Sequence, residues 1–152
     1  RSIVPLPIPE TPTTDVDWVA GASMLLRRDM LEQIGLFDET FFLYYEETDL
    51  CLRAKRAGWQ VAYVREGEVE HEGGASTGVT SSVVVPKPMP TYMFASRRHY
   101  FLKNHGRATL WQANAAHLVG VAFYRLRTHL GRRDYHRPRE WLDGVLYNLK
   151  NP

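Results

Sequence analysis

Several features that would define a protein class are missing from this 152-residue sequence. It has a single cysteine, Cys51, so an internal disulfide is excluded, and no signal peptide is visible at its start. It has no glycine-rich phosphate loop, no cysteine pair for zinc and no internal repeat. The uncharged stretch 108–124 is 17 residues long, short of the roughly 20 apolar residues that cross a bilayer. We therefore expect one soluble, globular chain in a reducing, cytoplasmic compartment.

Charge is distributed unevenly along the chain, although its net value is only +2. Residues 1–90 contain 8 basic and 14 acidic side chains, whereas residues 91–152 contain 11 basic and 3 acidic ones. The acidic half suits a metal or polar-substrate site, and the basic half suits an anionic partner or a membrane surface. Solvated helix faces explain the basic half about as well. Its aromatic residues lie at helical core spacing, so we expect no nucleic-acid partner.

Composition divides the chain into three parts. The proline-rich start predicts a linker or extended segment over 1–14, followed by an α/β part over 15–90. After Pro90 the apolar spacing becomes helical, which predicts a basic amphipathic extension over 91–152 with a helix from 108 to 130. Because the sequence does not begin with methionine, we expect it to be part of a longer protein.

The first elements of the α/β part are a strand and a short helix. Residues 16–26 form a mostly apolar run that predicts a buried strand. Asp29 and Glu32 then stand at capping-box spacing before a short helix over 30–34, which Gly35 ends.

A second helix is predicted to begin near Glu46 and to end at Gly58. Asp49 and Arg53 are four residues apart and can pair along one side of this helix. A short strand over 60–64 follows. The opposite, inward side contains Glu47 together with Leu50, Cys51, Ala54 and Ala57.

Two adjacent carboxylates, Glu46 and Glu47, stand at the start of this helix. The helix N-terminus favours their ionised form, and an ionised carboxylate can accept the proton of a hydroxyl. Aromatic faces offer apolar area to the C–H groups of a sugar, so the pattern fits a general base beside a carbohydrate site. Helix-start acids without a function are the commoner explanation of this pattern taken alone. The aromatic cluster that precedes the pair is Phe37, Phe41, Phe42, Tyr44 and Tyr45.

Two further patterns are typical of metal or phosphate binding. His71 lies in a loop with glycines, where a neutral imidazole can bind a metal or a phosphate-linked group, although a surface loop histidine fits as well. Asp15 and Asp17 form an Asp-x-Asp pattern, but they follow polar residues rather than an apolar strand. We interpret that pair as a chance match.

Several motifs occur in one order that resembles the inverting family-two glycosyltransferases. The resemblance covers roughly residues 15–80 and is strongest to the rhamnosyltransferase and galactofuranosyltransferase branch, which builds bacterial cell-surface polysaccharides. The residues that carry it are Asp17-Trp18-Val19-Ala20-Gly21-Ala22, Arg27-Arg28, Gly35-Leu36-Phe37-Asp38-Glu39, Phe41 to Arg53, Ala57-Gly58-Trp59, and His71 with Gly73 and Gly74.

The resemblance implies a GT-A fold, a Rossmann-like α/β sheet, of which this chain is the acceptor-side, C-terminal half. By similarity Glu47 is the general base that deprotonates the acceptor hydroxyl, while Glu46 and Asp49 orient acceptor hydroxyls or support the helix start. The family more often has Glu-Asp than Glu-Glu at this position, and this difference bears on which acid is the base. The residues that line the acceptor pocket are Trp18, Gly21, Ala22 and Tyr45.

The resemblance also implies the co-substrates. A nucleotide-sugar would be the donor, carrying rhamnose or a related hexose, and a glycan or lipid-linked molecule would be the acceptor. His71 matches a histidine that helps bind a divalent metal, Mg²⁺ or Mn²⁺, on the donor diphosphate. The donor half is not found in this sequence, so we expect the isolated chain to be inactive.

The basic helical extension resembles a part that lies on the cytoplasmic face of the membrane without spanning it. Packing of these helices on the missing half or on a second copy explains the same pattern. A half-sheet also exposes a strand edge, which favours homo-oligomers. The alternative to an enzyme is a non-catalytic module that docks on a membrane or a partner through its basic helices.

Overall fold

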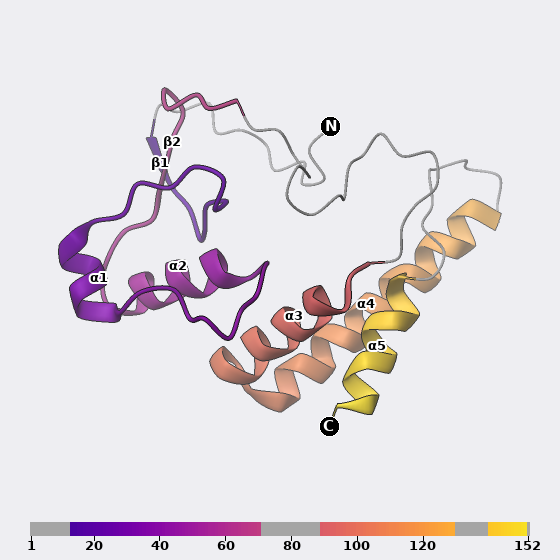
Figure 1. Ribbon diagram of the computed structural model, residues 1–152. Helices are drawn as coiled ribbons and strands as arrows, with labels where there is room; N and C mark the ends of the chain where they lie inside the picture. The colour runs from indigo at the N-terminus through magenta and orange to yellow at the C-terminus, as the bar shows by residue number, and fades with distance from the viewer. Residues whose placement is uncertain (1–12, 71–88, 130–139, 152) are drawn as a thin grey trace. The chain divides into compact units, whose positions relative to one another are not determined.

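The computed structural model describes residues 13–70, 89–129 and 140–151, which belong to two compact units (Figure 1). Unit 1 comprises residues 1–39 and 46–85, and unit 2 comprises residues 40–45 and 86–152. The chain therefore leaves unit 1 for only six residues before the candidate acids begin. The elements in order are β1 (Thr13–Asp15), α1 (Arg28–Ile34), α2 (Glu46–Arg56), β2 (Ala62–Val64), α3 (Thr91–Asn104), α4 (Gly106–His129) and α5 (Glu140–Lys150).

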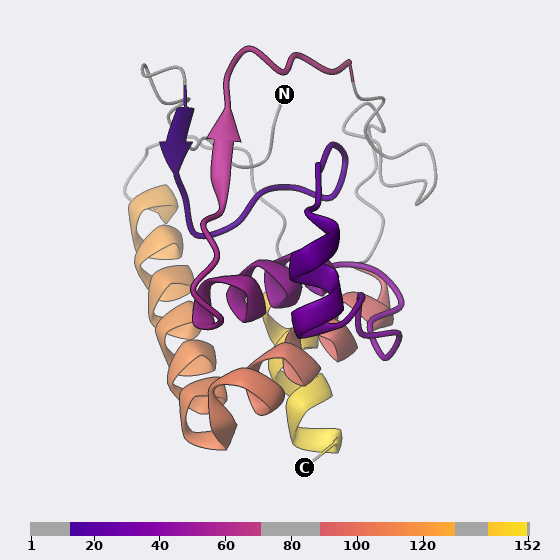
Figure 2. The same cartoon turned by 90° about the vertical axis from the view of Figure 1, so that its left-hand side faces the viewer.

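Unit 1 contains a two-stranded antiparallel sheet. Figure 2 shows β1 and β2 next to each other, and the register places Thr13 opposite Val64 and Asp15 opposite Ala62. The N–H of Val16 donates to the carbonyl of Val61 at 2.8 Å, which extends the pairing by one residue. The described residues are mostly helical, and the parallel Rossmann-like sheet expected of a GT-A fold is not among them.

The strand predicted over 16–26 is wrong. β1 ends at Asp15, and the backbone then turns at Ala20, whose carbonyl accepts the N–H of Ser23. The backbone of Val19 instead hydrogen-bonds the Cys51 thiol on α2. This apolar run packs along helix α2 rather than pairing with a neighbouring strand. The β-propensity of its residues did not decide the structure, because such propensity mainly reflects packing and depends on tertiary contacts.

The predicted helix over 30–34 is confirmed as part of α1, but its start differs. The N-cap is Arg27, and no side chain caps it. Asp29 accepts a 2.7 Å hydrogen bond from Arg27, so it does not form the predicted capping box with Glu32. The predicted stop is confirmed, because Gly35 has a φ of 81°, a left-handed value that glycine adopts without strain.

The predicted helix from Glu46 is confirmed as α2, and Gly58 ends it with a φ of 89°. Its inward face is also confirmed at Leu50, Cys51 and Ala54, which are all at most 3% exposed. Ala57 is exposed rather than inward, and it lies in the turn that follows the last helical residue, Arg56. The strand predicted over 60–64 is present in shorter form as β2.

Unit 2 consists of the segment 40–45 and helices α3, α4 and α5. Each of these helices packs against the other two. The prediction of a helical region after Pro90 is confirmed, with α4 beginning at Gly106, whose φ of 85° allows the sharp turn from α3. Leu110 on α4 is 2% exposed and lies in the core of this unit. Within the described ranges, no helix is long and apolar enough to cross a membrane.

Candidate active site

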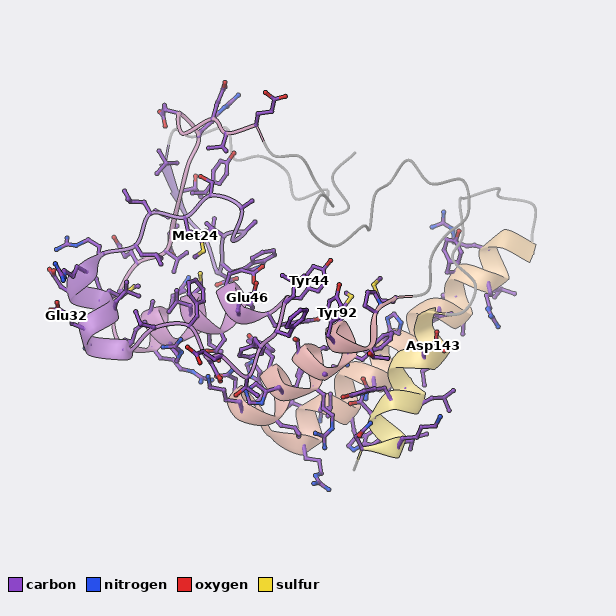
Figure 3. The ribbon with its side chains drawn as sticks, in the orientation of Figure 1. Met24, Glu32, Tyr44, Glu46, Tyr92 and Asp143 are labelled. Carbon is purple, nitrogen blue, oxygen red and sulfur yellow. The ribbon has the colours of Figure 1, made fainter. Side chains whose placement is uncertain are left out.

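The two candidate acids lie in the first turn of α2, where Figure 3 labels Glu46. Glu46 and Glu47 are both partly buried, and one oxygen of each, Oε2, is buried without a hydrogen-bond partner among the described residues. Orphaned buried oxygens cost free energy, so such groups normally find a partner in the fold or in a ligand. The pair therefore has unused hydrogen-bonding capacity at a helix start, where a hydroxyl donor can be accepted.

Burial raises the pKa of the Glu47 carboxyl above its ordinary value, because a charge loses hydration there. The negative charge of the neighbouring Glu46 raises this pKa further, while the backbone N–H of Glu47 acts in the opposite direction. A base works best when its pKa lies near the operating pH, so a raised pKa makes Glu47 a better proton acceptor than an ordinary surface carboxylate.

The loop after β1 lies along one face of α2. A Cβ built on Gly21 would be 3.9 Å from the Cβ of Glu47, and one turn further along α2 the backbone of Val19 reaches the Cys51 thiol. Lys55, a further turn along, donates to the carbonyl of Val16 at 3.0 Å. The structure thus brings Gly21 beside Glu47, while its role in acceptor binding stays a prediction.

The other two predicted residues of this loop differ in their exposure. Trp18 is half-buried and Ala22 is exposed. Asp15 and Asp17, the chance Asp-x-Asp match, both lie near the Lys55 ammonium, at 3.5 Å and 3.2 Å. The ammonium charge offsets the two carboxylates, and the pair anchors the loop to α2.

Asp49 lies deeper than predicted. Its side chain is completely buried, and Arg53 Nε donates to its Oδ2 at 2.9 Å. The predicted pair is confirmed, with its carboxylate completely buried and Arg53 20% exposed. The same guanidinium donates to the carbonyls of Ile34 at 2.6 Å and Leu36 at 2.8 Å, so it also holds the C-terminal end of α1. Asp49 therefore orients a cation that joins α1 to α2.

The aromatic segment before the acids packs on α3 in unit 2. The buried hydroxyl of Ser96 donates to the carbonyl of Leu43 at 2.9 Å. The rings of Tyr45 and Tyr100 have centroids 5.4 Å apart, and Phe41 is buried against His99 at 4.7 Å. The sequence reasoning missed this packing. The signal that could have indicated it is the set Tyr92, His99 and Tyr100, which the helical repeat places on one side of α3.

Two tyrosines of this segment have left-handed backbones. Tyr44 and Tyr45 both have a φ of 70°, a conformation that is uncommon for residues other than glycine. Figure 3 labels Tyr44 and Tyr92 at the place where their rings stack, with centroids 6.1 Å apart. Such strained backbone concentrates at functional sites and persists only where surrounding contacts hold it. Here those contacts come from α3, and the next residue in the chain is Glu46.

The predicted metal residue, His71, lies outside the described residues. Within 13–70, 89–129 and 140–151, no group of three His, Cys, Asp or Glu side chains could hold a metal ion. The described residues therefore do not by themselves fit a metal site.

The comparisons with known proteins concern the sequence of this region. Residues 11–85 match the family described as "Glycosyltransferase like family 2", so the chain carries a glycosyltransferase family 2-like region that includes the candidate acids. The chain is 40% identical over 85 residues to the N-acetylglucosaminyl-diphospho-decaprenol L-rhamnosyltransferase of Mycobacterium tuberculosis. That alignment covers 55% of this chain and 28% of the relative.

Two further relatives match over a shorter stretch. Rhamnosyltransferase WbbL of Escherichia coli is 45% identical over 51 residues, which is 34% of this chain and 19% of WbbL. The low-salt glycan biosynthesis hexosyltransferase Agl10 of Haloferax volcanii is 43% identical over 51 residues, which is 34% of this chain and 17% of Agl10. The chain thus matches less than a third of the length of these relatives. No solved structure matches it.

Proposed function

We propose that this chain is the acceptor-side part of a metal-dependent inverting glycosyltransferase. The complete protein transfers a hexose, such as rhamnose, from a nucleotide-diphosphate donor to a hydroxyl of a glycan in cell-surface polysaccharide synthesis. The family match over 11–85 and the similarity to proteins named as rhamnosyltransferases support this proposal. The name of the mycobacterial relative contains a diphospho-decaprenol, which favours a lipid-linked acceptor.

Glu47 is the general base in this proposal. Its carboxylate takes the proton of the acceptor hydroxyl, the hydroxyl oxygen attacks the anomeric carbon, and the nucleoside diphosphate leaves from the opposite side. The observation that carries the assignment is the orphaned, partly buried oxygen of Glu47 together with its raised pKa. Glu46, which has an orphaned oxygen too, raises that pKa and orients acceptor hydroxyls.

The remaining site residues have supporting roles. Gly21 leaves room beside Glu47 for the acceptor. Trp18 and Ala22, which belong to the same loop, offer apolar side chains to the acceptor in this proposal. Tyr45 contributes the last aromatic ring before the acids. Asp49 acts through Arg53, because its carboxylate is completely buried and already engaged.

The donor and the metal require further parts of the protein. We place the donor half, with the rest of a GT-A sheet, upstream of this chain. His71 would be one metal ligand, and Mg²⁺ or Mn²⁺ would offset the charge of the departing diphosphate. Calorimetric titration with Mn²⁺ and UDP or dTDP tests this: a protein extended upstream should bind, and His71→Ala should weaken binding. If the extended protein binds neither nucleotide, the donor assignment is wrong.

The base assignment is tested by Glu47→Gln in the complete protein. We expect turnover to be abolished while donor binding persists, because the amide cannot accept the proton. Glu46→Gln should retain part of the activity, and Glu32→Gln, which changes an exposed acid on α1, should retain all of it. Unchanged turnover in the Glu47 variant would remove this residue from the mechanism.

A second function, docking on an anionic membrane, is favoured by an apolar stripe on α4. Val119, Phe123 and Leu126 are 55%, 66% and 57% exposed and lie one helical turn apart on one side of the helix. Arg125 and Arg127 lie close by in the sequence, and cations beside an apolar stripe suit anionic headgroups. Phe123→Asp should abolish co-sedimentation with anionic vesicles. A wild-type chain that does not sediment with vesicles but forms dimers would assign the stripe to a second copy.

A further inference from the structure

A cavity of about 290 Å³ lies among the three helices of unit 2. This volume is at the low end of the range for small-molecule sites. Figure 1 shows α3, α4 and α5 packed side by side around this region. The lining residues that matter here are Met93, Phe94 and Arg97 from α3, Asn114 and His117 from α4, and Val145 from α5.

The lining of the cavity includes an unusual polar pair. Arg97 Nη1 donates to Asn114 Oδ1 at 2.6 Å. Because a guanidinium has only donors, this bond turns the amide oxygen of Asn114 toward Arg97 and its Nδ2 away. Asn114 is 4% exposed, and its Nδ2 is buried with no hydrogen-bond partner among the described residues. A buried donor without an acceptor is rare in a folded protein and indicates a missing partner.

Arg97 gives this polar pair a positive charge. Among the described residues no carboxylate forms an ion pair with Arg97, and its guanidinium lies over the ring of Phe101 at 4.9 Å. The bond to Asn114 uses one of the five N–H donors of the guanidinium. His117 adds a ring nitrogen to the same lining. The pair therefore complements an oxyanion, which accepts several hydrogen bonds at once.

The rest of the lining is apolar. Met93 and Phe94 on α3 and Val145 on α5 offer hydrocarbon and aromatic surface. A Cβ built on Gly144 would lie 3.2 Å from a ring atom of Phe94, so α5 approaches α3 closely at this wall. Apolar surface of this kind is favourably covered by a hydrocarbon chain.

We propose that this cavity binds a small amphiphile with an oxyanion head, a phosphate ester or a carboxylate. The head lies against Arg97 and Asn114, and the first part of the hydrocarbon chain lies against Met93, Phe94 and Val145. The volume equals about ten water molecules of liquid, so a longer chain has to leave the cavity. This binding goes beyond the proposed sugar transfer, and it can be measured without turnover.

The four methionines allow a direct test. Met89 and Met93 line the cavity, whereas Met24 and Met30 belong to unit 1. We would label the methionine methyl groups with ¹³C and titrate the chain with octyl phosphate while recording their NMR signals. The methyl signals of Met89 and Met93 should shift to saturation, and those of Met24 and Met30 should not.

Three further probes identify the ligand class. Octanol, which lacks the charge, and inorganic phosphate, which lacks the chain, should each bind at least about tenfold more weakly than octyl phosphate. If octanoate binds as tightly as octyl phosphate, the site accepts oxyanion head groups in general. If octanoate binds more weakly, the site is specific for phosphate esters. Equal binding of octanol, no shift with octyl phosphate, or parallel shifts of all four methyl groups would overturn the proposal.

Variants test the polar pair itself. Arg97→Gln should raise the Kd for octyl phosphate about tenfold or more, whereas Arg98→Gln, the adjacent arginine outside the lining, should change it by less than about twofold. Asn114→Leu removes the orphaned amide at similar volume and should weaken octyl phosphate but not octanol. If both cavity variants fold and bind octyl phosphate like the wild type, the head site is wrongly assigned.

Discussion

Replacement of Arg53 by methionine tests the buried ion pair that supports the candidate site. The change keeps the aliphatic length of the side chain but removes the guanidinium that bonds Asp49, Ile34 and Leu36. Asp49 is 0% exposed and Arg53 is 20% exposed, so the charge left behind is a buried one. Breaking a buried pair from one side costs about 3 to 5 kcal/mol, and the partial exposure of Arg53 favours the lower end.

The protonation of Asp49 gives an independent upper bound on this loss of unfolding free energy. If Asp49 without Arg53 takes up a proton in the folded state at pH 7, the cost is about 4 kcal/mol, from a reference pKa of about 3.9 and about 1.4 kcal/mol for each pH unit. The loss should therefore shrink as the pH falls toward 4, because protonation then becomes cheaper. A total stability of about 5 to 15 kcal/mol makes such a change easy to detect.

The measurement is urea denaturation of the whole chain at several pH values, followed by tryptophan fluorescence. The matched control is Arg28→Met, which breaks the pair with Glu32, also four residues apart but exposed at both ends. We expect the control to cost less than about 0.5 kcal/mol. A loss below about 1 kcal/mol for Arg53→Met, independent of pH, would refute the assignment of a buried structural pair.

Three further predictions use the same assay. Glu47→Gln should stabilise the chain at neutral pH. The raised pKa of Glu47 favours its protonated form in the folded state, so the wild type loses stability as the pH rises through that pKa. The stabilities of the two proteins should therefore converge at low pH. Equal stability at every pH would contradict this. Ser96→Ala should lower the free energy of unfolding by about 1 to 2 kcal/mol, because it removes the buried bond to Leu43. The control Thr109→Ala removes an exposed hydroxyl bond to a carbonyl and should lower it by less. A reversed order would speak against the packing of segment 40–45 on α3. Gly35→Ala should destabilise the chain by about 1 kcal/mol, because the backbone at this position is left-handed. Gly120→Ala, within α4, should instead stabilise it by about 0.5 to 1 kcal/mol. Similar effects of both changes would show that alanine is not strained at position 35.

The path of the chain explains why the helical extension matters to the candidate site. Residues 40–45 belong to unit 2, and Glu46 begins α2 in unit 1. The backbone of Tyr44 and Tyr45 is left-handed, and the contacts of this segment with α3 hold it there. Removal of 91–152 would therefore take away the support of the segment that leads directly into the two acids, whether or not the extension also docks on a membrane.

Local signals predicted the helices well. The stops at Gly35 and Gly58, the start at Glu46 and the apolar face with Leu50 depend on interactions within a few residues, and the structure confirms them. The strand predicted over 16–26 failed because an apolar run is equally compatible with packing on a helix. The capping box at Asp29 failed because a neighbouring arginine offered its carboxylate a stronger, charged partner.

The sequence by itself determined the helix boundaries of α2, the adjacent pair Glu46 and Glu47, and the order of motifs that matches the glycosyltransferase family. Only the tertiary structure decided that the carboxylate of the Asp49–Arg53 pair is completely buried, that Arg53 also bonds the end of α1, and that burial raises the pKa of Glu47. The reason is physical: a motif specifies which groups are adjacent in the chain, whereas burial and charge environment depend on segments that are distant in the sequence. For the same reason, no local pattern could have indicated the cavity among α3, α4 and α5.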